Sequence, residues 1–203
     1  MKRIGLFGGS FNPVHTGHLI LAEYAREETA LDEILFVPAR TPPHKPLQPL
    51  APAEDRLEML DLAIKGNSTF QSSDLELNRS GPSYTLQTVM ELKKSKEEKE
   101  KLFLILGADS ILDLPNWWRS KELIEEVEII GLKRPGYSME QLEDLHSYFA
   151  EDTVRELRES LIEAPLLQIS ATEIRNRIIN EKSIRYLVPD PVRDYIRENE
   201  LFI

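Results

Sequence analysis

Two of the four histidines in this 203-residue chain lie three residues apart, on either side of a Thr-Gly pair. His15 and His18 follow the stretch IGLFGGSFNPV, in which a short apolar run leads into Gly8 and Gly9. A glycine pair after a strand lets the chain turn sharply and exposes backbone N–H groups. A helix with Thr16 as its N-cap would add the positive end of its dipole, which suits a phosphate group. The two imidazoles are therefore predicted to flank a phosphate.

Other phosphate-binding and metal-binding motifs do not match this stretch. The chain lacks the GxxxxGK[ST] sequence of a P-loop, and GGSFNP differs from the GxGxxG dinucleotide fingerprint. The histidines are spaced i, i+3, whereas zinc-binding helices space them i, i+4. There are no cysteines, so the sequence offers neither a thiolate metal site nor a disulfide. Gly17, between the histidines, leaves room for a bulky ligand near the backbone.

A second candidate anion site follows the apolar residues 166–169. Ser170 and Glu173 have the spacing of a capping box, which predicts the start of another helix. Arg175, one turn into that helix, can reach back toward an anion near the helix N-terminus. Taken alone, this pattern is more typical of a well-capped helix with a surface arginine.

Apolar runs of strand length alternate along the chain with segments of helical spacing. This alternation indicates an α/β protein whose parallel sheet is covered by helices on both faces. The predicted strands are 4–7, 34–37, 102–106, 129–132 and 166–169, with a further short strand within 69–77. The predicted helices are 19–29, 54–65, 84–94, one from residue 172 onward, and 191–199. Residues 38–52 hold six of the 13 prolines and are predicted to form an extended loop.

Composition and charge narrow the class of protein. With 41% hydrophobic and 30% charged residues, the chain is predicted to be one globular domain, residues 1–203. Its net charge of −10 and the lack of a basic stripe argue against a nucleic-acid partner. No apolar run reaches the length of about 18 residues that a membrane span needs, and no signal peptide is visible. We therefore expect a cytoplasmic protein with no membrane partner, and a homo-oligomer is left open.

The stretch GGSFNPVHTGH resembles the GxFxPxHxGH signature of the nucleotidylyltransferase superfamily, whose members join a nucleoside triphosphate to a phosphate-bearing acceptor. Residues 166–178, LLQISATEIRNRI, resemble its ISSTxxR element, with Ala171 in place of the second serine. Four further stretches are similar to the nicotinate-nucleotide adenylyltransferase family: PARTPPHK, NRSGPSYTLQT, LGADSILDLPNWW and SIRYLVPDPVRDYI. The resemblance spans residues 3–202.

This resemblance implies a Rossmann-like, doubly wound parallel sheet with a small C-terminal helical part. It also implies that the 5′-phosphate of nicotinate mononucleotide attacks the α-phosphorus of ATP in line, giving nicotinate adenine dinucleotide and pyrophosphate. Because an ionised phosphate needs no general base, the protein would act by alignment and charge stabilisation. Mg²⁺ is expected on the ATP phosphates, and no residue is assigned as a metal ligand.

The resemblance also assigns roles to individual residues. The catalytic residues would be His15, His18, Lys45 and Arg175. ATP would be bound by Gly8, Gly9, Ser10, Phe11, His15, His18, Gly107, Asp109, Ile169, Ser170, Thr172 and Arg175. Nicotinate mononucleotide would be bound by Ser10, His44, Lys45, Tyr84, Thr85, Asp109 and Trp117. Trp117 would stack on the pyridine ring, and backbone N–H groups near Tyr84 and Thr85 would receive the carboxylate. Trp118 is instead predicted to pack in the core or at its rim.

Two positions depart from the family pattern, and several alternatives stay open. Asn12 stands where the superfamily often has aspartate, and Gln87 replaces the aspartate of SYTxDT. The acceptor could instead be nicotinamide mononucleotide or pantetheine phosphate. A class I aminoacyl-tRNA synthetase fragment is disfavoured by the short, acidic chain and the lack of a KMSKS-like loop. A non-catalytic nucleotide-binding regulator is disfavoured because both histidines and Arg175 are present.

Overall fold

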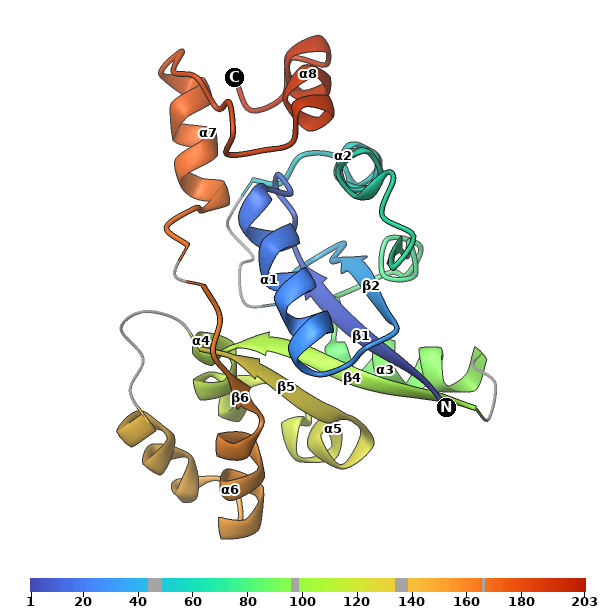
Figure 1. Cartoon of the computed structure of the whole chain (residues 1–203), viewed down its shortest axis with the longest axis vertical. Helices are drawn as coiled ribbons and strands as arrows, with labels where there is room; N and C mark the ends of the chain where they lie inside the picture. The colour runs from blue at the N-terminus through green and yellow to red at the C-terminus, as the bar shows by residue number, and fades with distance from the viewer. Residues whose placement is uncertain (44–48, 96–98, 134–138, 166) are drawn as a thin grey trace. The chain divides into compact units, whose positions relative to one another are not determined.

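The computed structural model describes residues 1–43, 49–95, 99–133, 139–165 and 167–203 (Figure 1). The strands are β1 (Lys2–Gly9), β2 (Glu33–Pro38), β3 (Phe70–Ser72), β4 (Glu100–Gly107), β5 (Glu128–Leu132) and β6 (Leu161–Ile162). The α-helices are α1 (Thr16–Glu28), α2 (Ala53–Ile64), α3 (Thr85–Ser95), α4 (Ala108–Leu112), α5 (Ser120–Glu126), α6 (Glu151–Glu159), α7 (Ala171–Ile179) and α8 (Asp190–Glu198). Two 3₁₀ helices are η1 (Leu114–Asn116) and η2 (Met139–Ser147).

The six strands form one parallel sheet in the order β3-β2-β1-β4-β5-β6. Leu6 of β1 lies opposite Leu104 of β4, and Ile105 of β4 lies opposite Ile130 of β5. The chain builds outward from β1 to β3, then returns to add β4, β5 and β6 on the other side of β1. This is the strand order of the doubly wound, Rossmann-like α/β fold, so the predicted fold class is confirmed.

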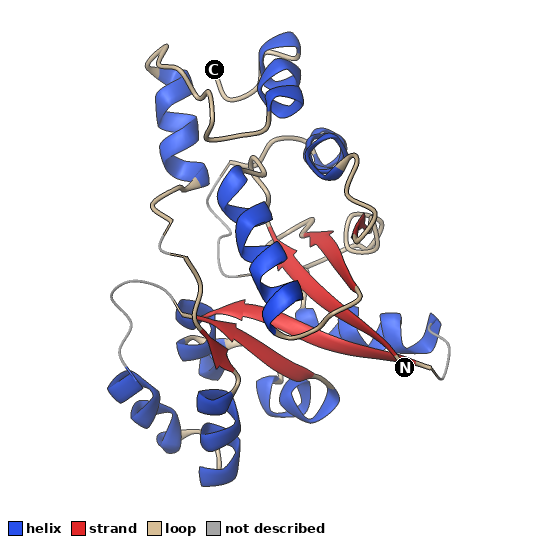
Figure 2. Ribbon diagram, in the orientation of Figure 1, coloured by secondary structure: helices blue, strands red, loops and turns tan. Residues whose placement is uncertain are grey.

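Strand β4 illustrates why these segments become parallel strands. All five residues from Leu102 to Leu106 are buried. Because successive side chains of a strand point to opposite faces, five consecutive buried residues require cover on both faces. Figure 2 shows β4 and β5 running side by side in the same direction, as their register requires.

The chain divides into two interleaved units. The first comprises Met1–Phe7, Tyr24–Ile34 and Tyr84–Leu166, and the second comprises Gly8–Glu23, Leu35–Ser83 and Leu167–Ile203. In the first unit α3 packs against α5, where Lys93 Nζ donates to the Glu126 carbonyl at 2.9 Å, and α6 packs against η2. In the second unit α2 packs against α8 and β3. The single domain expected over residues 1–203 stays a prediction.

The prediction of a strand at 166–169 is wrong for residues 167–169, and Leu166 lies outside the described residues. The sixth strand is instead Leu161–Ile162, which pairs with Gly131 and Leu132 of β5. Pro165 has no N–H to donate to a ladder, so it cannot extend this strand toward residue 167. Residues 167–170 form neither helix nor strand and lead directly into α7.

Helices α4, α5 and α6 and both 3₁₀ helices were not predicted from the sequence. Helix α6 shows the reason, because only two of its nine residues, Val154 and Leu157, are buried. A single i, i+3 pair is too short a repeat to establish a helical period from sequence.

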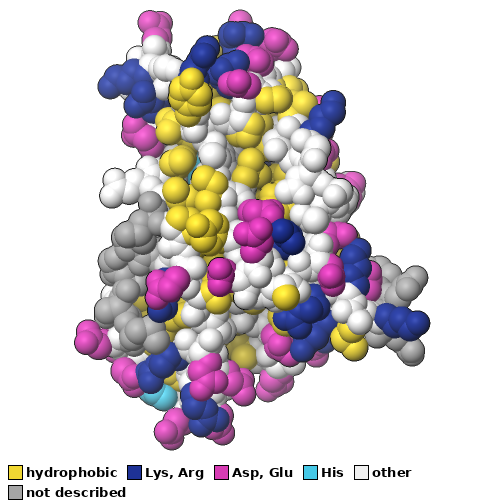
Figure 3. Space-filling model, in the orientation of Figure 1, with side chains coloured by type: hydrophobic (Ala, Val, Ile, Leu, Met, Phe, Trp, Pro, Cys, Tyr) yellow, Lys and Arg dark blue, Asp and Glu magenta, His cyan; other side chains and the backbone are white. Residues whose placement is uncertain are grey.

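On the face shown in Figure 3, acidic and basic side chains are interspersed. None of the helices in the described residues is long and apolar enough to cross a membrane.

A hydrogen bond between α8 and α2 gives a prediction about the stability of the second unit. Tyr195 Oη donates to Asp55 Oδ1 at 2.7 Å. We expect Tyr195→Phe to lower the free energy of unfolding by about 0.5–1.5 kcal/mol near neutral pH, measured by urea denaturation.

The same bond predicts a pH dependence. The hydrogen bond to Asp55, assisted by burial, raises the pKa of Tyr195 to about 12. An unfolded tyrosine ionises near pH 10, so this stabilisation is complete below about pH 10 and is lost as the pH rises to about 12. The phenylalanine variant should lack this component of alkaline destabilisation. An unchanged denaturation profile across that range would contradict the prediction.

Candidate nucleotide-binding site

The turn after β1 is built around a buried phenylalanine with an unusual backbone conformation. Phe11 is 1% exposed and has a φ of 44°, a region that few non-glycine residues occupy. A Cβ on Gly9 would lie 3.1 Å from the Phe11 ring, which is closer than most Cβ contacts, so the ring packs tightly over Gly9. The Phe11 ring meets the His18 ring edge-on, with 5.1 Å between centroids and 72° between planes. Phe11 thus supports His18 from the interior of the second unit.

The two histidines of the opening motif lie face to face. Their ring centroids are 3.6 Å apart and their planes differ by 20°. His15 is buried and His18 is half-buried. The His15 N–H donates to His18 Nδ1 at 3.2 Å, and the His18 N–H donates to the His15 carbonyl at 2.9 Å. The prediction that both imidazoles occupy the same part of the molecule is confirmed.

The hydrogen bond to Nδ1 determines which nitrogen of His18 can donate. Because Nδ1 is the acceptor, the neutral imidazole carries its proton on Nε2. This arrangement resembles the return half of a capping box, in which the third helical residue bonds back to the N–H that precedes the helix. The Nε2–H of His18 is therefore a donor suited to a phosphate oxygen.

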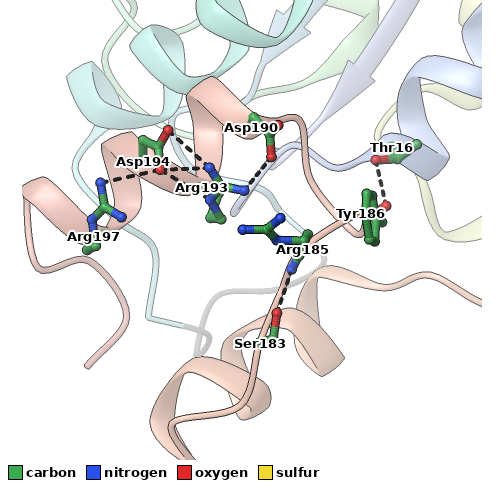
Figure 4. Close-up of polar contacts among 8 residues, drawn as sticks. All are labelled: Thr16, Ser183, Arg185, Tyr186, Asp190, Arg193, Asp194 and Arg197. Atoms are coloured by element: carbon green, nitrogen blue, oxygen red, sulfur yellow. Dashed lines mark hydrogen bonds and ion pairs between the residues drawn. The ribbon is translucent and has the colours of Figure 1, made fainter.

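The start of α1 is held by a segment far away in the sequence (Figure 4). Thr16 N–H donates to the Leu187 carbonyl at 2.9 Å, and Thr16 Oγ1 donates to the Tyr186 carbonyl at 3.2 Å. The prediction of Thr16 as the N-cap is therefore wrong, because Thr16 is the first helical residue and its hydroxyl bonds to Tyr186. The N–H groups of Thr16 and His18 are both used within the protein, so in this conformation neither is a phosphate donor.

The SIRYLVPDPVRDYI stretch supplies these two carbonyls. Figure 4 shows Arg193 of α8 between Asp190 and Asp194, with an Nη2 to Asp194 Oδ1 distance of 3.0 Å. Arg197 reaches the same Asp194 oxygen at 3.4 Å. Tyr186, with a φ of 69°, offers its carbonyl to Thr16 while its side chain stays exposed. This stretch therefore has a structural role in completing the start of α1.

The His15 ring packs closely against Gly17. A Cβ at residue 17 would lie 3.0 Å from His15 Nδ1 and 3.2 Å from His15 Cε1. We expect Gly17→Ala to displace the imidazole and to lower kcat for the nucleotidyl transfer that the resemblance implies by about tenfold, because small misplacements of reacting groups reduce rates strongly. Steady-state pyrophosphate release measures this.

The control for Gly17→Ala is Glu28→Ala, at the exposed end of the same helix. This control variant should retain wild-type kcat. Equal kcat values for the Gly17 variant and the control would contradict the packing argument.

The N-terminus of α7 lies against the opening motif within the second unit. Ser170 is the N-cap and accepts from the Glu173 N–H at 3.1 Å, so the predicted cap is confirmed. Ile169 Cβ would be 3.5 Å from a Cβ on Gly17. Arg175 Nη1 donates to the Asn12 carbonyl at 2.8 Å, and its Nη2 donates to Thr172 Oγ1 at 3.2 Å. Two predicted anion sites far apart in sequence are thus brought together.

Two buried polar side chains, Asn12 and Arg56, form hydrogen bonds to backbone groups of the loops next to the opening motif. Asn12 Nδ2 donates to the Pro49 carbonyl at 3.1 Å, and Asn12 Oδ1 accepts from the Ala51 N–H at 2.9 Å. An aspartate could accept from Ala51 but could not donate to Pro49, so asparagine suits this turn. Arg56 of α2, 1% exposed, donates to the carbonyls of Ser10, Ala39 and Ala51.

Arg56 was not among the residues predicted from the sequence. A signal was present, because residue 56 falls in the same apolar stripe as Leu60 and Ile64 of a predicted amphipathic helix. A charged residue at such a position is a candidate buried structural cation.

The remaining residues of the second unit that belong to the predicted motifs are Gly8, Ser83, His44 and Lys45. Gly8 is exposed, and a Cβ there would meet nothing within 4 Å, so packing does not require glycine. Ser83 is buried, and its Oγ accepts from the N–H of Arg40 at 3.0 Å and of Thr41 at 3.3 Å. His44 and Lys45, both predicted to bind substrate, lie outside the described residues.

The first unit holds four of the seven residues predicted to bind nicotinate mononucleotide, Tyr84, Thr85, Asp109 and Trp117, together with Gly107, which was predicted to bind ATP. Gly107 ends β4, and Asp109 lies in the first turn of α4. Trp117 follows η1 and is fixed by its Nε1–H, which donates to Asp113 Oδ2 at 3.2 Å. Thr85 begins α3. These residues are therefore carried by short elements that follow the carboxyl end of β4 and by the start of α3.

Trp118, rather than Trp117, stacks on Tyr84. The two ring centroids are 4.8 Å apart at an interplanar angle of 25°. Trp118 is 39% exposed, and the Arg119 guanidinium lies 5.1 Å from its ring centroid. This agrees with the prediction that Trp118 packs at a rim. The roles of Trp117, Tyr84 and Thr85 toward a ligand stay predictions.

Comparison with known proteins identifies the family. A family model described as Cytidylyltransferase-like matches residues 6–177. The nicotinate-nucleotide adenylyltransferase of Bacillus subtilis (strain 168) is 41% identical over 202 residues, which cover 100% of this chain and 99% of that protein. The chain belongs to the nicotinate-nucleotide adenylyltransferase family.

Two further proteins are similar to this chain over its full length. A "Probable nicotinate-nucleotide adenylyltransferase" of Geobacillus thermodenitrificans (strain NG80-2) is 44% identical, covering 100% of this chain and 87% of that one. A solved structure of the Plasmodium falciparum nicotinic acid mononucleotide adenylyltransferase, complexed with NaAD, superposes with a TM-score of 0.77. It is 22% identical and covers 100% of this chain and 98% of that chain, so it supports the fold of the family.

Proposed function

We propose that this chain transfers the adenylyl group of ATP to the 5′-phosphate of nicotinate mononucleotide, giving nicotinate adenine dinucleotide and pyrophosphate. The observation that carries the proposal is the stacked His15–His18 pair, placed by a GGSFNPVHTGH motif within a full-length family match. The reaction is a step of NAD biosynthesis.

In this mechanism the acceptor phosphate oxygen attacks the α-phosphorus as the bond to the departing pyrophosphate oxygen breaks. No proton needs to be removed from an ionised phosphate, so alignment and charge stabilisation supply the rate. The Nε2–H of His18 would donate to a phosphate oxygen whose charge rises in the transition state. His15 would support that ring from its stacked position, and Arg175 would receive the outer phosphates.

Magnesium would enter as the ATP complex. Among the described residues no group of three or more His, Asp or Glu side chains gathers that could hold a metal ion. We expect Mg²⁺ on the phosphate oxygens, where it would neutralise charge on the triphosphate. A cytoplasmic location, a homo-oligomer and the lack of a nucleic-acid partner stay predictions.

Pyrophosphate release tests the proposed function. The chain is mixed with ATP and Mg²⁺, and nicotinate mononucleotide, nicotinamide mononucleotide and pantetheine phosphate are compared at equal concentration. A strong preference for nicotinate mononucleotide is expected. Equal use of both pyridine nucleotides would retain the chemistry and reject carboxylate selection near Thr85. ATP binding without release for any acceptor would reject adenylyl transfer and favour a nucleotide-binding regulator.

A further inference from the structure

Arg56 is a buried cation that is held by backbone carbonyls. Its Nη1 donates to the carbonyls of Ser10 and Ala39, each at 2.8 Å, and its Nε donates to the carbonyl of Ala51 at 3.1 Å. None of the ion pairs among the described residues includes Arg56. Burial lowers the pKa of the Arg56 guanidinium, and the charge of Glu54 partly opposes that shift. A buried guanidinium is costly unless its donors are satisfied, so these three contacts determine its position.

The contact with Ser10 fixes a peptide plane in the turn after β1. A trans peptide places its N–H opposite its C=O. With the Ser10 carbonyl directed at Arg56, the Phe11 N–H must point away from Arg56. Phe11 also has a φ of 44°, and such a conformation persists only where neighbours enforce it. Arg56 is one of those neighbours.

The same turn leads directly to the predicted catalytic histidine. The Phe11 ring lies edge-on to the His18 ring at 5.1 Å, and His18 stacks on His15 at 3.6 Å. A shift of the Ser10–Phe11 peptide would therefore move the surface on which the His18 imidazole rests. The chain of contacts runs from the Arg56 guanidinium to the imidazoles without a gap.

We propose that Arg56 is a positioning residue for adenylyl transfer, acting through the Ser10–Phe11 peptide on the His18 ring. This inference rests on the proposed function, because nucleotidyl transfer is its kinetic readout. With 1% exposure, the Arg56 side chain does not reach substrate itself. Its effect is therefore expected in kcat more than in substrate binding.

The kinetic test uses Arg56→Lys and Arg56→Met. Lysine keeps the charge but cannot span three carbonyls with a rigid fork, and methionine removes the charge as well. Both variants are expected to lower kcat by about 10–100-fold, because a small misplacement of the imidazole weakens transition-state contacts. KM values for ATP and for the acceptor should stay within about threefold of wild type.

A matched control separates positioning from stability. Tyr195→Phe removes the hydrogen bond to Asp55, the residue before Arg56, and leaves the Ser10 contact intact. Tyr195→Phe and Arg56→Lys are both assayed at a temperature well below their thermal midpoints. The control should keep wild-type kcat, whereas Arg56→Lys should not. Equal kcat values for the two variants would overturn the proposal.

A second measurement does not depend on turnover. In protein labelled with ¹³C-histidine, the His18 Cε1–Hε1 resonance is assigned by its absence from the His18→Ala spectrum. That resonance is expected to shift in Arg56→Lys and to stay in place in Tyr195→Phe. An unshifted resonance in Arg56→Lys would overturn the proposal. If the wild-type chain releases no pyrophosphate with any acceptor, the proposed function fails, while the shift still decides the role of Arg56.

A double variant tests the route through His18. If Arg56 acts on His18, then Arg56→Lys in a His18→Ala background should reduce kcat by no more than about threefold further. If the fold-loss of kcat in the double variant equals the product of the losses in the two single variants, Arg56 acts independently of His18 and the proposed route is overturned.

Discussion

Replacing His18 with alanine is expected to lower kcat for pyrophosphate release by about 10²–10³-fold, the typical cost of one directed donor to transition-state charge. The reason lies in the tautomer, because Nδ1 accepts from the His15 N–H and leaves the proton on Nε2. The fold should persist, because His18 is half-buried and leaves no large cavity. Steady-state kinetics and circular dichroism of the same preparation measure both quantities.

Two conservative variants separate the local bond of His18 from its chemistry. In His18→Asn the side-chain oxygen can take the place of Nδ1 and accept from His15, but no donor reaches the position of Nε2. In His18→Gln the terminal amide can place an N–H near Nε2. We expect the glutamine variant to be the more active of the two. Near-normal kcat in His18→Ala, or higher kcat with asparagine, would contradict the assigned donor.

Arg175→Met is expected to lower kcat/KM for ATP by about 10²–10³-fold. Arg175 is anchored at the turn by its bonds to the Asn12 carbonyl and to Thr172 Oγ1. Partial burial lowers the pKa of its guanidinium, and an anion beside it would favour the charged form. Loss of the charge should therefore weaken binding of the outer phosphates, which initial rates at varied ATP concentration will measure.

Arg177→Met provides the matched control on the same helix. Arg177 Nε donates to the Ser183 carbonyl at 2.8 Å, and its Nη1 lies 3.8 Å from Glu173 Oε1. Exposed contacts of this kind contribute little, so kcat/KM for ATP should stay near wild type in this variant. If both variants lose the same activity, the loss reflects the stability of α7 rather than phosphate binding.

Much of the candidate site could be predicted from local patterns in the sequence. The His15–His18 spacing and the cap at Ser170 each depend on residues a few positions apart, and the structure has both in the expected place. The sharp turn expected at Gly8 and Gly9 is wrong, because both glycines belong to β1. Residues 102–106 of β4 were equally visible because all five are apolar. These features follow from short-range rules of turns, caps and burial.

Contacts between residues that are far apart in the sequence could not be predicted from these local patterns. Thr16 looks like an N-cap by sequence, yet its hydroxyl bonds to a carbonyl 170 positions away. Arg56 lies in the apolar stripe of a predicted helix, yet its contacts with the carbonyls of Ser10 and Ala39 could not be predicted from that stripe. The strand at 161–162 depends on its pairing with β5. In each case the deciding partner is fixed by the tertiary fold.

The hydrogen bonds between Thr16 and residues 186–187 have a consequence for the order in which the parts of a nascent chain fold. A ribosome-bound chain that ends before residue 186 already contains all six strands, because β6 ends at Ile162. It still lacks the two carbonyls that receive the Thr16 N–H and hydroxyl at the start of α1. Domains fold as synthesis proceeds, so the sheet can form before the helix that carries His18 is fully anchored. The imidazole pair would then be among the last parts of the molecule to reach its final geometry.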